Sequence, residues 1–141
     1  MRIKALADTG ALLALLDRND RWHSACLNAF AKLHLPLITS TAVLTELFHL
    51  IGDSEHDVRA TWAFIRSGAV SVLPIHDTDL SVLDRLMDKY SDRPMDFADA
   101  TLVLFAQRQS LNTVFTIDFN DFETYRVEGR KRFRILPSRS V

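Results

Sequence analysis

The fold is decided by the stretch Ile3-Lys4-Ala5-Leu6-Ala7-Asp8-Thr9-Gly10. It is a short apolar run that ends on an acid, a hydroxyl residue and a glycine. A run of this kind, without the in-and-out alternation of a half-exposed sheet, is typical of a strand buried in a parallel sheet. We therefore expect a buried strand at Ile3–Ala7, with Asp8 directly at its carboxyl end.

Similar short apolar segments recur along the chain and are separated by stretches with helical spacing of apolar residues. Further strands are expected at 37–39, 70–73, 113–117 and 133–136. Helices are expected at 11–16, from Thr78 to Tyr90, and at 97–109. Three more are expected to begin at a capping residue: from Asn19 or Asp20 to Leu33, from Ser40 or Thr41 to Ile51, and from Ser54 to Gly68, where the glycine ends the helix. Alternating strands and helices predict a three-layer α/β/α sandwich with a mainly parallel, roughly five-stranded sheet.

The composition is that of an ordinary globular protein. The chain has 141 residues, of which 48% are hydrophobic and 25% charged, so we expect a single domain over 1–141. The only cysteine, Cys26, cannot form an internal disulfide, which favours a reducing cytoplasm. Asp8 interrupts the apolar N-terminal stretch, and no apolar run approaches the length of a membrane helix, so neither a signal peptide nor a membrane span is expected.

Charge is unevenly distributed although the net charge is only −1. Acids dominate between Asp77 and Asp99, and basic residues dominate after residue 125. Solvated surfaces explain both stretches on charge alone. A weaker interpretation is that the basic residues position phosphates; these are Arg126, Arg130, Lys131, Arg132 and Arg134.

Four acids are placed to meet at one end of the predicted sheet. Asp8 and Asp118 each follow a strand directly, Glu46 lies in the helix after the second strand, and Asp99 lies in the first turn of the helix before the fourth. Ligands bind at the carboxyl ends of parallel strands, so convergence of these four side chains indicates a functional site.

Each acid also has a purely structural explanation. Asp8 is a plausible helix cap, Asp118 and Asp121 fit a turn, and Asp96 fits the cap of the helix at 97–109. We leave Asp121 as a turn residue. Glu46 is harder to explain structurally, because its surroundings, Ala42-Val43-Leu44-Thr45-Glu46-Leu47-Phe48, are almost wholly apolar and a buried carboxylate is costly unless paired.

The candidate ligands are all oxygens, which predicts the metal. The five histidines show no zinc-like spacing, and His49, although three residues after Glu46, lacks the partners of a di-iron helix motif. Carboxylates without Cys/His clusters favour Mg²⁺ or Mn²⁺.

Four segments carry a family resemblance. They are Leu-Ala-Asp8-Thr-Gly-Ala-Leu-Leu, Ser40-Thr-Ala-Val-Leu-Thr-Glu46-Leu, Pro-Met-Asp-Phe-Ala-Asp99-Ala-Thr-Leu-Val and Val-Phe-Thr-Ile-Asp118-Phe-Asn-Asp-Phe. In this order they resemble the four motifs of PIN domains, from about Ile3 to Leu136. The size and style of the sequence are similar to the VapC-type toxins of bacterial toxin–antitoxin pairs.

The resemblance implies an Mg²⁺- or Mn²⁺-dependent endoribonuclease, often a homodimer, held inactive by a small VapB-like antitoxin. The family's metal acids map onto Asp8, Glu46, Asp99 and Asp118. Thr9 and Thr116 match small hydroxyl positions that orient the acids, and Asp96 is a possible addition. Our hypothesis is that Asp8 and Asp99 hold the principal ion and that the other two complete the shell, hold a second ion or orient the attacking water.

Other classes of protein remain as alternatives. A haloacid-type phosphatase needs Asp-x-Asp after its first strand, and a response-regulator receiver needs an acidic pair there; Asp8-Thr9-Gly10 provides neither. The chain has four glycines and no Gly-rich loop, which argues against nucleotide binding. A non-catalytic PIN-like interaction module is the remaining alternative, and metal dependence would distinguish it.

Overall fold

The computed structural model describes residues 1–139, so the expected domain bounds of 1–141 extend two residues beyond the described part. Five parallel strands form one sheet in the order β3-β2-β1-β4-β7. The strands are β1 (Ile3–Ala7), β2 (Leu33–Ser40), β3 (Val70–Leu73), β4 (Thr113–Phe115) and β7 (Arg134–Leu136). The predicted α/β/α architecture with a parallel sheet is confirmed.

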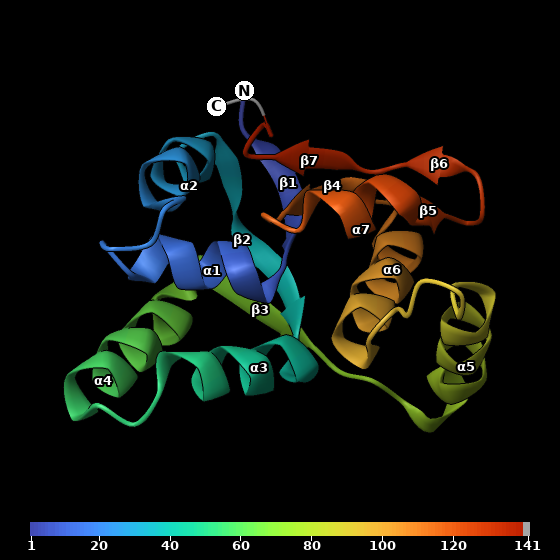
Figure 1. Cartoon of the computed structure of the whole chain (residues 1–141), viewed down its shortest axis with the longest axis horizontal. Coiled ribbons are helices and arrows are strands. Elements are labelled where there is room, and N and C mark those ends of the chain that lie inside the picture. Colours follow the sequence, from blue (N-terminus) through green and yellow to red (C-terminus); the bar gives the residue numbers. More distant parts are fainter. Residues whose placement is uncertain (140–141) are drawn as a thin grey trace.

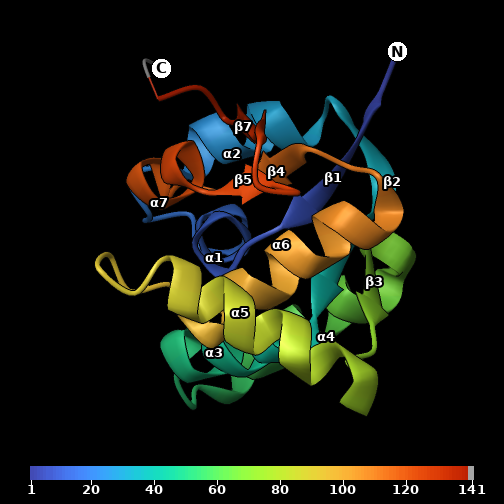
Figure 2. The same cartoon turned by 90° about the vertical axis from the view of Figure 1, so that its right-hand side faces the viewer.

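Helices cover both faces of this sheet. They are α1 (Thr9–Leu16), α2 (His23–Phe30), α3 (Thr41–Ile51), α4 (Glu55–Phe64), α5 (Leu80–Lys89), α6 (Phe97–Gln109) and α7 (Phe119–Thr124). In Figure 1, α1 and α2 lie to the left of the sheet and α5 and α6 to its right; in Figure 2, α5 and α6 lie in front of it. Helix α3 packs against both α1 and α6, and therefore reaches across the carboxyl ends of the strands.

The order of the strands creates a crevice next to β1. The chain runs from β1 to β2 and then β3 on one side of β1, but β4 and β7 pair on the other side. The loops that follow β1 and β4 therefore leave in opposite directions. In open parallel sheets this reversal point is where ligands bind, so the fold itself directs attention to the residues after Ala7 and Phe115.

Two elements form the centre of the core. Ala5, Leu6 and Ala7 of β1 are at most 1% exposed, and every residue of α6 from Ala98 to Ala106 is buried. Helix α6 is therefore apolar around most of its circumference, as expected for a helix enclosed by protein. Asp99 lies within this buried part of the helix, in its first turn.

Several boundaries differ from the predicted ones. Helix α2 begins at His23, without a side-chain cap, and ends at Phe30, while Leu33, predicted as helical, starts strand β2 by pairing with Ile3. Helix α4 ends at Phe64, and an irregular turn of π type over Ile65–Ala69 follows it. A 3-10 turn at Asp77–Asp79 precedes α5.

The segment after β4 departs most from the prediction. Strand β4 ends at Phe115, so Asp118 follows the strand by three residues rather than directly. The predicted turn at Asp118-Phe-Asn-Asp121 is wrong, because Asp118 is the N-terminal cap residue of α7. A short antiparallel hairpin, β5 (Arg126–Val127) with β6 (Lys131–Arg132), then leads to β7.

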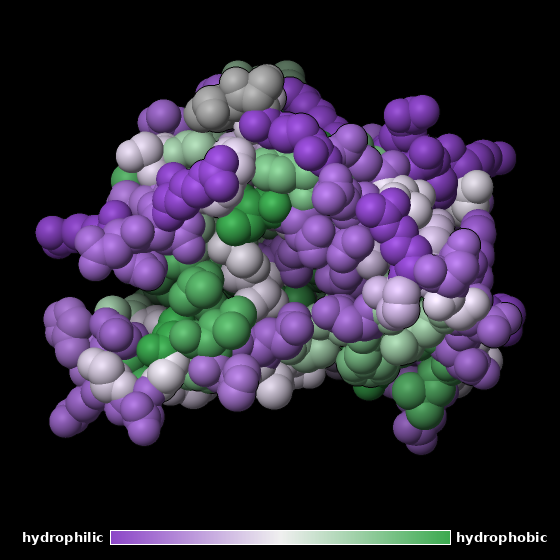
Figure 3. Space-filling view, viewed as in Figure 1, coloured by the Kyte–Doolittle hydropathy of each residue, from purple (hydrophilic) through white to green (hydrophobic). Residues whose placement is uncertain are grey.

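The surface offers little that is unusual. Among the helices of residues 1–139, none combines the length and hydropathy that a bilayer crossing requires. Figure 3 shows apolar side chains gathered over α1 and α4, where a cavity of about 620 Å³ is lined in part by Leu13, Leu16, Leu50 and Ile51. Cys26 is buried and forms no disulfide.

Candidate active site

One cavity contains all four predicted acids. It has a volume of about 340 Å³ and lies at the carboxyl ends of β1 and β4. Its lining residues are Asp8, Thr9, Gly10, Glu46, Leu50, Asp96, Asp99, Ile117 and Asp118. Acids from four separate segments of the sequence therefore share a single hollow.

Asp8 is held by the end of the sheet and by two hydroxyl-bearing residues. Its backbone N–H donates to the Phe115 carbonyl (2.9 Å), continuing the β1–β4 pairing past Ala7. Its carboxylate accepts from the Thr9 N–H (2.8 Å) and from the Thr116 hydroxyl (2.8 Å). Asp8 therefore caps α1, as the structural explanation proposes, yet it is only 5% exposed and also faces the cavity.

Close packing at Gly10 keeps the two strand ends together. A Cβ atom placed on Gly10 would lie 3.0 Å from Cγ1 of Ile117. The first turn of α1 therefore approaches the segment after β4 more closely than a larger residue would easily allow. Thr116 links the same two segments, because its oxygen accepts from the Asp118 N–H (2.9 Å) while its hydroxyl donates to Asp8.

Asp99 is held in the first turn of α6. Asp96 caps this helix, as predicted, and accepts from the Asp99 N–H (2.8 Å). The Asp99 side chain accepts at Oδ2 from the Tyr125 hydroxyl (2.8 Å) and is 6% exposed. Asp96 also lines the cavity, so its capping role and its position at the site coexist.

Glu46 is less buried than the sequence predicts. Ser40 caps α3 and hydrogen-bonds the Thr101 hydroxyl (2.8 Å), which fixes the start of α3 against α6. Only Val43 and Leu47 of α3 are buried, and Glu46 is partly exposed at the edge of the cavity. The expectation that Glu46 is a buried carboxylate is therefore wrong. Its Oε1 accepts from the Thr9 hydroxyl (3.0 Å), and this hydrogen bond holds Glu46 against α1, next to Asp8.

Asp121 belongs to the same group of acids, although we interpreted it as a turn residue. One oxygen from each of Asp99, Asp118 and Asp121 lies within 4.8 Å of the others, a spacing that can hold a metal ion. Asp118 and Asp121 are three residues apart across the first turn of α7, and therefore share a face of that helix. The i, i+3 spacing of Asp118 and Asp121 could have indicated from the sequence that both acids belong to the site. We missed it because we interpreted the segment as a turn rather than a helix.

Crowding and burial make these carboxyls difficult to ionise. Burial, with smaller contributions from Asp8 and Asp96, raises the pKa of Asp99 to about 9. Burial also raises the pKa of Asp8 to about 6, although hydrogen bonds from Thr116 and Thr9 oppose the shift. The pKa of Asp118 is raised to about 6 by partial burial of its carboxyl and by Asp121.

The residues of the site fit a divalent cation. Within residues 1–139, none of the side chains lining the cavity is Lys, Arg or His. The clustered acids therefore have no protein cation in the cavity to offset their charge. A ligand set made only of oxygens suits Mg²⁺ or Mn²⁺.

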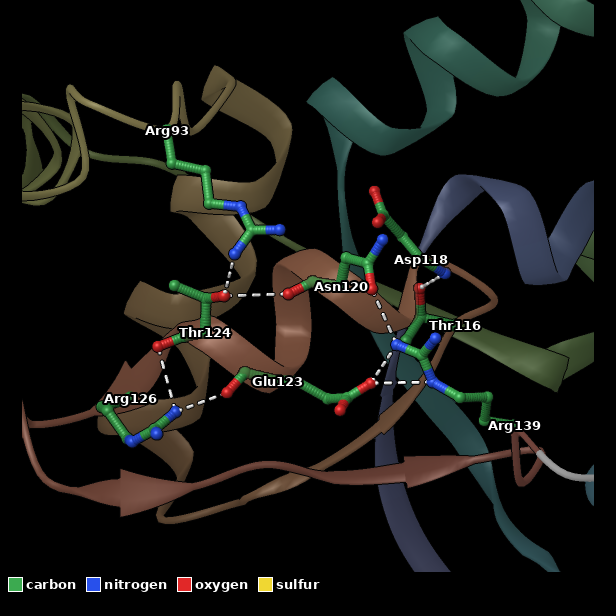
Figure 4. A network of polar contacts seen from close by, with 8 residues as sticks. All are labelled: Arg93, Thr116, Asp118, Asn120, Glu123, Thr124, Arg126 and Arg139. Atoms are coloured by element: carbon green, nitrogen blue, oxygen red, sulfur yellow. Dashed lines mark hydrogen bonds and ion pairs between the residues drawn. The ribbon is translucent and has the colours of Figure 1, made fainter.

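Two of the basic C-terminal residues, Arg126 and Arg139, are engaged away from the acidic cavity. The Arg126 guanidinium donates to the backbone carbonyls of Glu123, Thr124 and Tyr125, and therefore closes the C-terminal end of α7. Figure 4 shows Arg126 at the opposite end of α7 from Asp118. Arg139 is bonded to Glu123 and Asn120. The idea that Arg126 positions phosphates is therefore not supported.

Comparisons with known proteins place the chain in a family and find similar proteins. The PIN domain family profile matches residues 5–128. Ribonuclease VapC26 of Mycobacterium tuberculosis (strain ATCC 25618 / H37Rv) is 30% identical over 138 residues, which cover 94% of this chain and 99% of that protein. The crystal structure of Mycobacterium tuberculosis VapC20, described as a Sarcin-Ricin loop cleaving toxin, matches with a TM-score of 0.73 and 21% sequence identity. This match covers 84% of the present chain and 94% of the VapC20 chain.

The profile match spans most of the chain, and the sheet with its acidic crevice agrees with it. The chain belongs to the PIN-domain family. Within that family it is a VapC-type protein, and so a nuclease, because its similarity to VapC26 extends over nearly the whole length of both chains.

Proposed function

We propose that this chain is a metal-dependent endoribonuclease, the toxin of a toxin–antitoxin pair, and that Asp8, Glu46, Asp99 and Asp118 form its metal-binding active site. The convergence of four segments on one acidic cavity without a protein cation carries the proposal. The 30% identity to a named ribonuclease supports the choice of RNA as substrate.

The four acids divide into two pairs by burial. Asp8 and Asp99 are the buried pair and would hold the principal Mg²⁺ or Mn²⁺ ion, while the more exposed Glu46 and Asp118 would complete its shell or orient the attacking water. A bound divalent ion would lower the pKa of water and neutralise charge on the phosphoryl oxygens. Thr9 and Thr116 orient Glu46 and Asp8 through their hydroxyls, and Asp96 supports Asp99 through its backbone N–H.

The partners follow from the same assignment. We propose single-stranded RNA as the substrate, because unpaired bases can be splayed away from a small cavity. A VapB-like antitoxin is proposed as the inhibitor and a homodimer as the active assembly. Leu50, which is 56% exposed, lines both the acidic cavity and the cavity beside α4, so a partner covering that second cavity would reach the site. A cytoplasmic location is proposed from the lone, buried Cys26.

The proposal is tested by incubating antitoxin-free protein with a pool of tRNA, rRNA and mRNA. We expect discrete cleavage with Mg²⁺ or Mn²⁺ and none with EDTA, because the acids alone repel the phosphate backbone. Restoring Mg²⁺ after EDTA should restore cleavage and so rules out damage by the chelator. Cleavage that persists in EDTA, or none in any metal from protein of native fold, would contradict the proposal and favour an interaction module.

Asp121 provides a prediction about the edge of the site. We expect Asp121→Asn to weaken Mn²⁺ binding and slow cleavage by about 10-fold, in the range typical of residues that support a metal shell. The matched control is Glu55→Gln, which neutralises an acid in the first turn of a different helix, α4. Calorimetric Mn²⁺ titration and initial cleavage rates provide the measurement. If the two variants bind and cleave alike, Asp121 contributes only to the first turn of α7.

A further inference from the structure

Of the two tyrosines in the chain, only Tyr125 donates its hydroxyl to an acid of the cavity. Tyr125 lies outside the four segments that resemble the PIN-domain motifs. Its Oη lies 2.8 Å from Oδ2 of Asp99, twenty-six residues earlier in the sequence. Tyr125 directly follows α7, as the residue that ends this helix, and is 1% exposed. The contact therefore joins the end of α7 to the first turn of α6 inside the core.

The ring of Tyr125 is held on two sides. Tyr90 packs edge-on to it with ring centroids 5.1 Å apart, and Phe122 does the same at 5.2 Å. These packed rings restrict the direction in which the hydroxyl can point. Its partner Asp99 is fixed through the backbone, since the Asp96 side chain accepts from the Asp99 N–H.

The backbone after Tyr125 is fixed as well. The Arg126 N–H donates to the Tyr90 hydroxyl (3.0 Å), and the Arg126 side chain bonds three consecutive carbonyls, one of which is that of Tyr125. Tyr125 is therefore anchored through its ring and through its own carbonyl.

We propose that Tyr125 is a positioning residue for the metal site: its hydroxyl holds one oxygen of Asp99 and so presents the other to the cation. This inference rests on the metal-dependent function proposed above. Groups that hydrogen-bond a metal ligand fix its orientation, and their removal typically weakens metal binding by about 10- to 100-fold. The alternative is that the hydrogen bond serves only to satisfy a buried polar pair.

The burial of the hydroxyl agrees with a donor that stays protonated. Burial and the neighbouring Asp99 charge both raise the pKa of Tyr125, so the phenol keeps its proton and continues to donate throughout the physiological range. An ionised Asp99, as metal binding requires, accepts that hydrogen bond more strongly than a neutral carboxyl does.

The chain contains a matched control. It has two tyrosines, and both are buried and in contact with each other, but the Tyr90 hydroxyl accepts from a backbone N–H and is not bonded to an acid of the site. Tyr125→Phe and Tyr90→Phe therefore each remove one buried hydroxyl and leave the aromatic packing in place. Only the first removes a hydrogen bond to a proposed metal ligand.

Mn²⁺ affinity is the first measurement, made by electron paramagnetic resonance on each folded protein. We expect Tyr125→Phe to weaken Mn²⁺ binding about 10-fold or more and Tyr90→Phe to change it by less than about twofold. RNA cleavage by Tyr125→Phe should fall at limiting Mn²⁺ and recover in excess Mn²⁺. Equal affinities in the two variants, or a loss of cleavage that excess Mn²⁺ does not recover, would overturn the proposal.

A second measurement on the wild-type chain covers the case in which Tyr125→Phe does not fold. Labelling tyrosine with ¹³C at Cζ gives two signals, which Tyr90→Phe assigns. Titration with Mg²⁺ should shift the Tyr125 signal and leave that of Tyr90 in place; a stationary Tyr125 signal while calorimetry shows Mg²⁺ binding would overturn the proposal. If the wild type binds neither Mg²⁺ nor Mn²⁺, the proposed function itself fails, which is a distinguishable result.

Discussion

Asp99→Asn, and separately Asp8→Asn, are expected to lower metal-dependent RNA cleavage by at least about 10³-fold. A catalytic metal contributes several kcal/mol to stabilising the transition state, and about 1.4 kcal/mol corresponds to a tenfold change in rate. Each change removes a proposed ligand of the principal ion, one from the end of β1 and one from the first turn of α6.

Asparagine is the substitution of choice because it preserves the local structure. At position 8 the amide oxygen can still accept from the Thr9 N–H, and the NH2 group that replaces the second oxygen faces the Thr116 hydroxyl, which can accept as well as donate. At position 99 the amide oxygen can still accept from Tyr125, and asparagine is a good helix cap. Asp92→Asn, which neutralises an exposed acid outside the cavity, is the matched control and should retain wild-type activity. Initial rates on an RNA that the wild type cleaves provide the measurement. An Asp8 or Asp99 variant of native fold with more than about a tenth of the wild-type rate would contradict the assignment, because that loss amounts to only about 1.4 kcal/mol.

The second large effect concerns stability without metal. Burial, followed by the charges of Asp8 and Asp96, raises the pKa of Asp99 from its ordinary 3.8 to about 9. At pH values between these limits the folded state binds a proton that the unfolded chain has lost. The free energy of unfolding is therefore highest below the unfolded pKa and falls as the pH rises through the folded one.

Comparison with Asp99→Asn isolates this contribution. We expect the metal-free wild type to lose about 2 kcal/mol of stability relative to Asp99→Asn between about pH 6 and about pH 8. Adding Mg²⁺ at the higher pH should stabilise the wild type and have little effect on the variant, since a ligand that binds only the folded state raises its stability. Guanidinium unfolding followed by circular dichroism, with EDTA or Mg²⁺, gives both values. A difference between the two proteins that does not change with pH would refute the prediction.

Both predictions concern the same physical conflict at the site. Buried carboxylates that lie close together destabilise the folded chain when no metal is bound. The same arrangement is the one expected to attract a divalent ion. Activity and metal-free stability are therefore expected to change in opposite directions on substitution of Asp99. The exposed acids of α5, such as Asp84 and Asp88, lie outside this conflict and fit the interpretation of a solvated surface.

Local signals were sufficient for most elements and for the positions of Asp8 and Asp99. The strands at Ile3–Ala7 and Val70–Leu73 and the helix at Phe97–Gln109 have the predicted bounds, because short apolar runs and a capped, periodic stretch are unambiguous. Helix α7 was missed, since six residues are too few for a periodic pattern to distinguish a helix from a turn. Strand β2 starts earlier than predicted because Leu33 gains a pairing partner in β1.

The sequence by itself therefore determined the class of fold and the end of the sheet at which the acids collect, because hydrophobic spacing and capping act over a few residues. Only the tertiary structure decided the strand order, the inclusion of Asp121 and the contact between Tyr125 and Asp99. It also decided that Arg126 closes a helix and that Glu46 remains partly exposed. Burial, charge crowding and hydrogen bonds between distant segments depend on which elements become neighbours, and that is settled by packing of the whole chain.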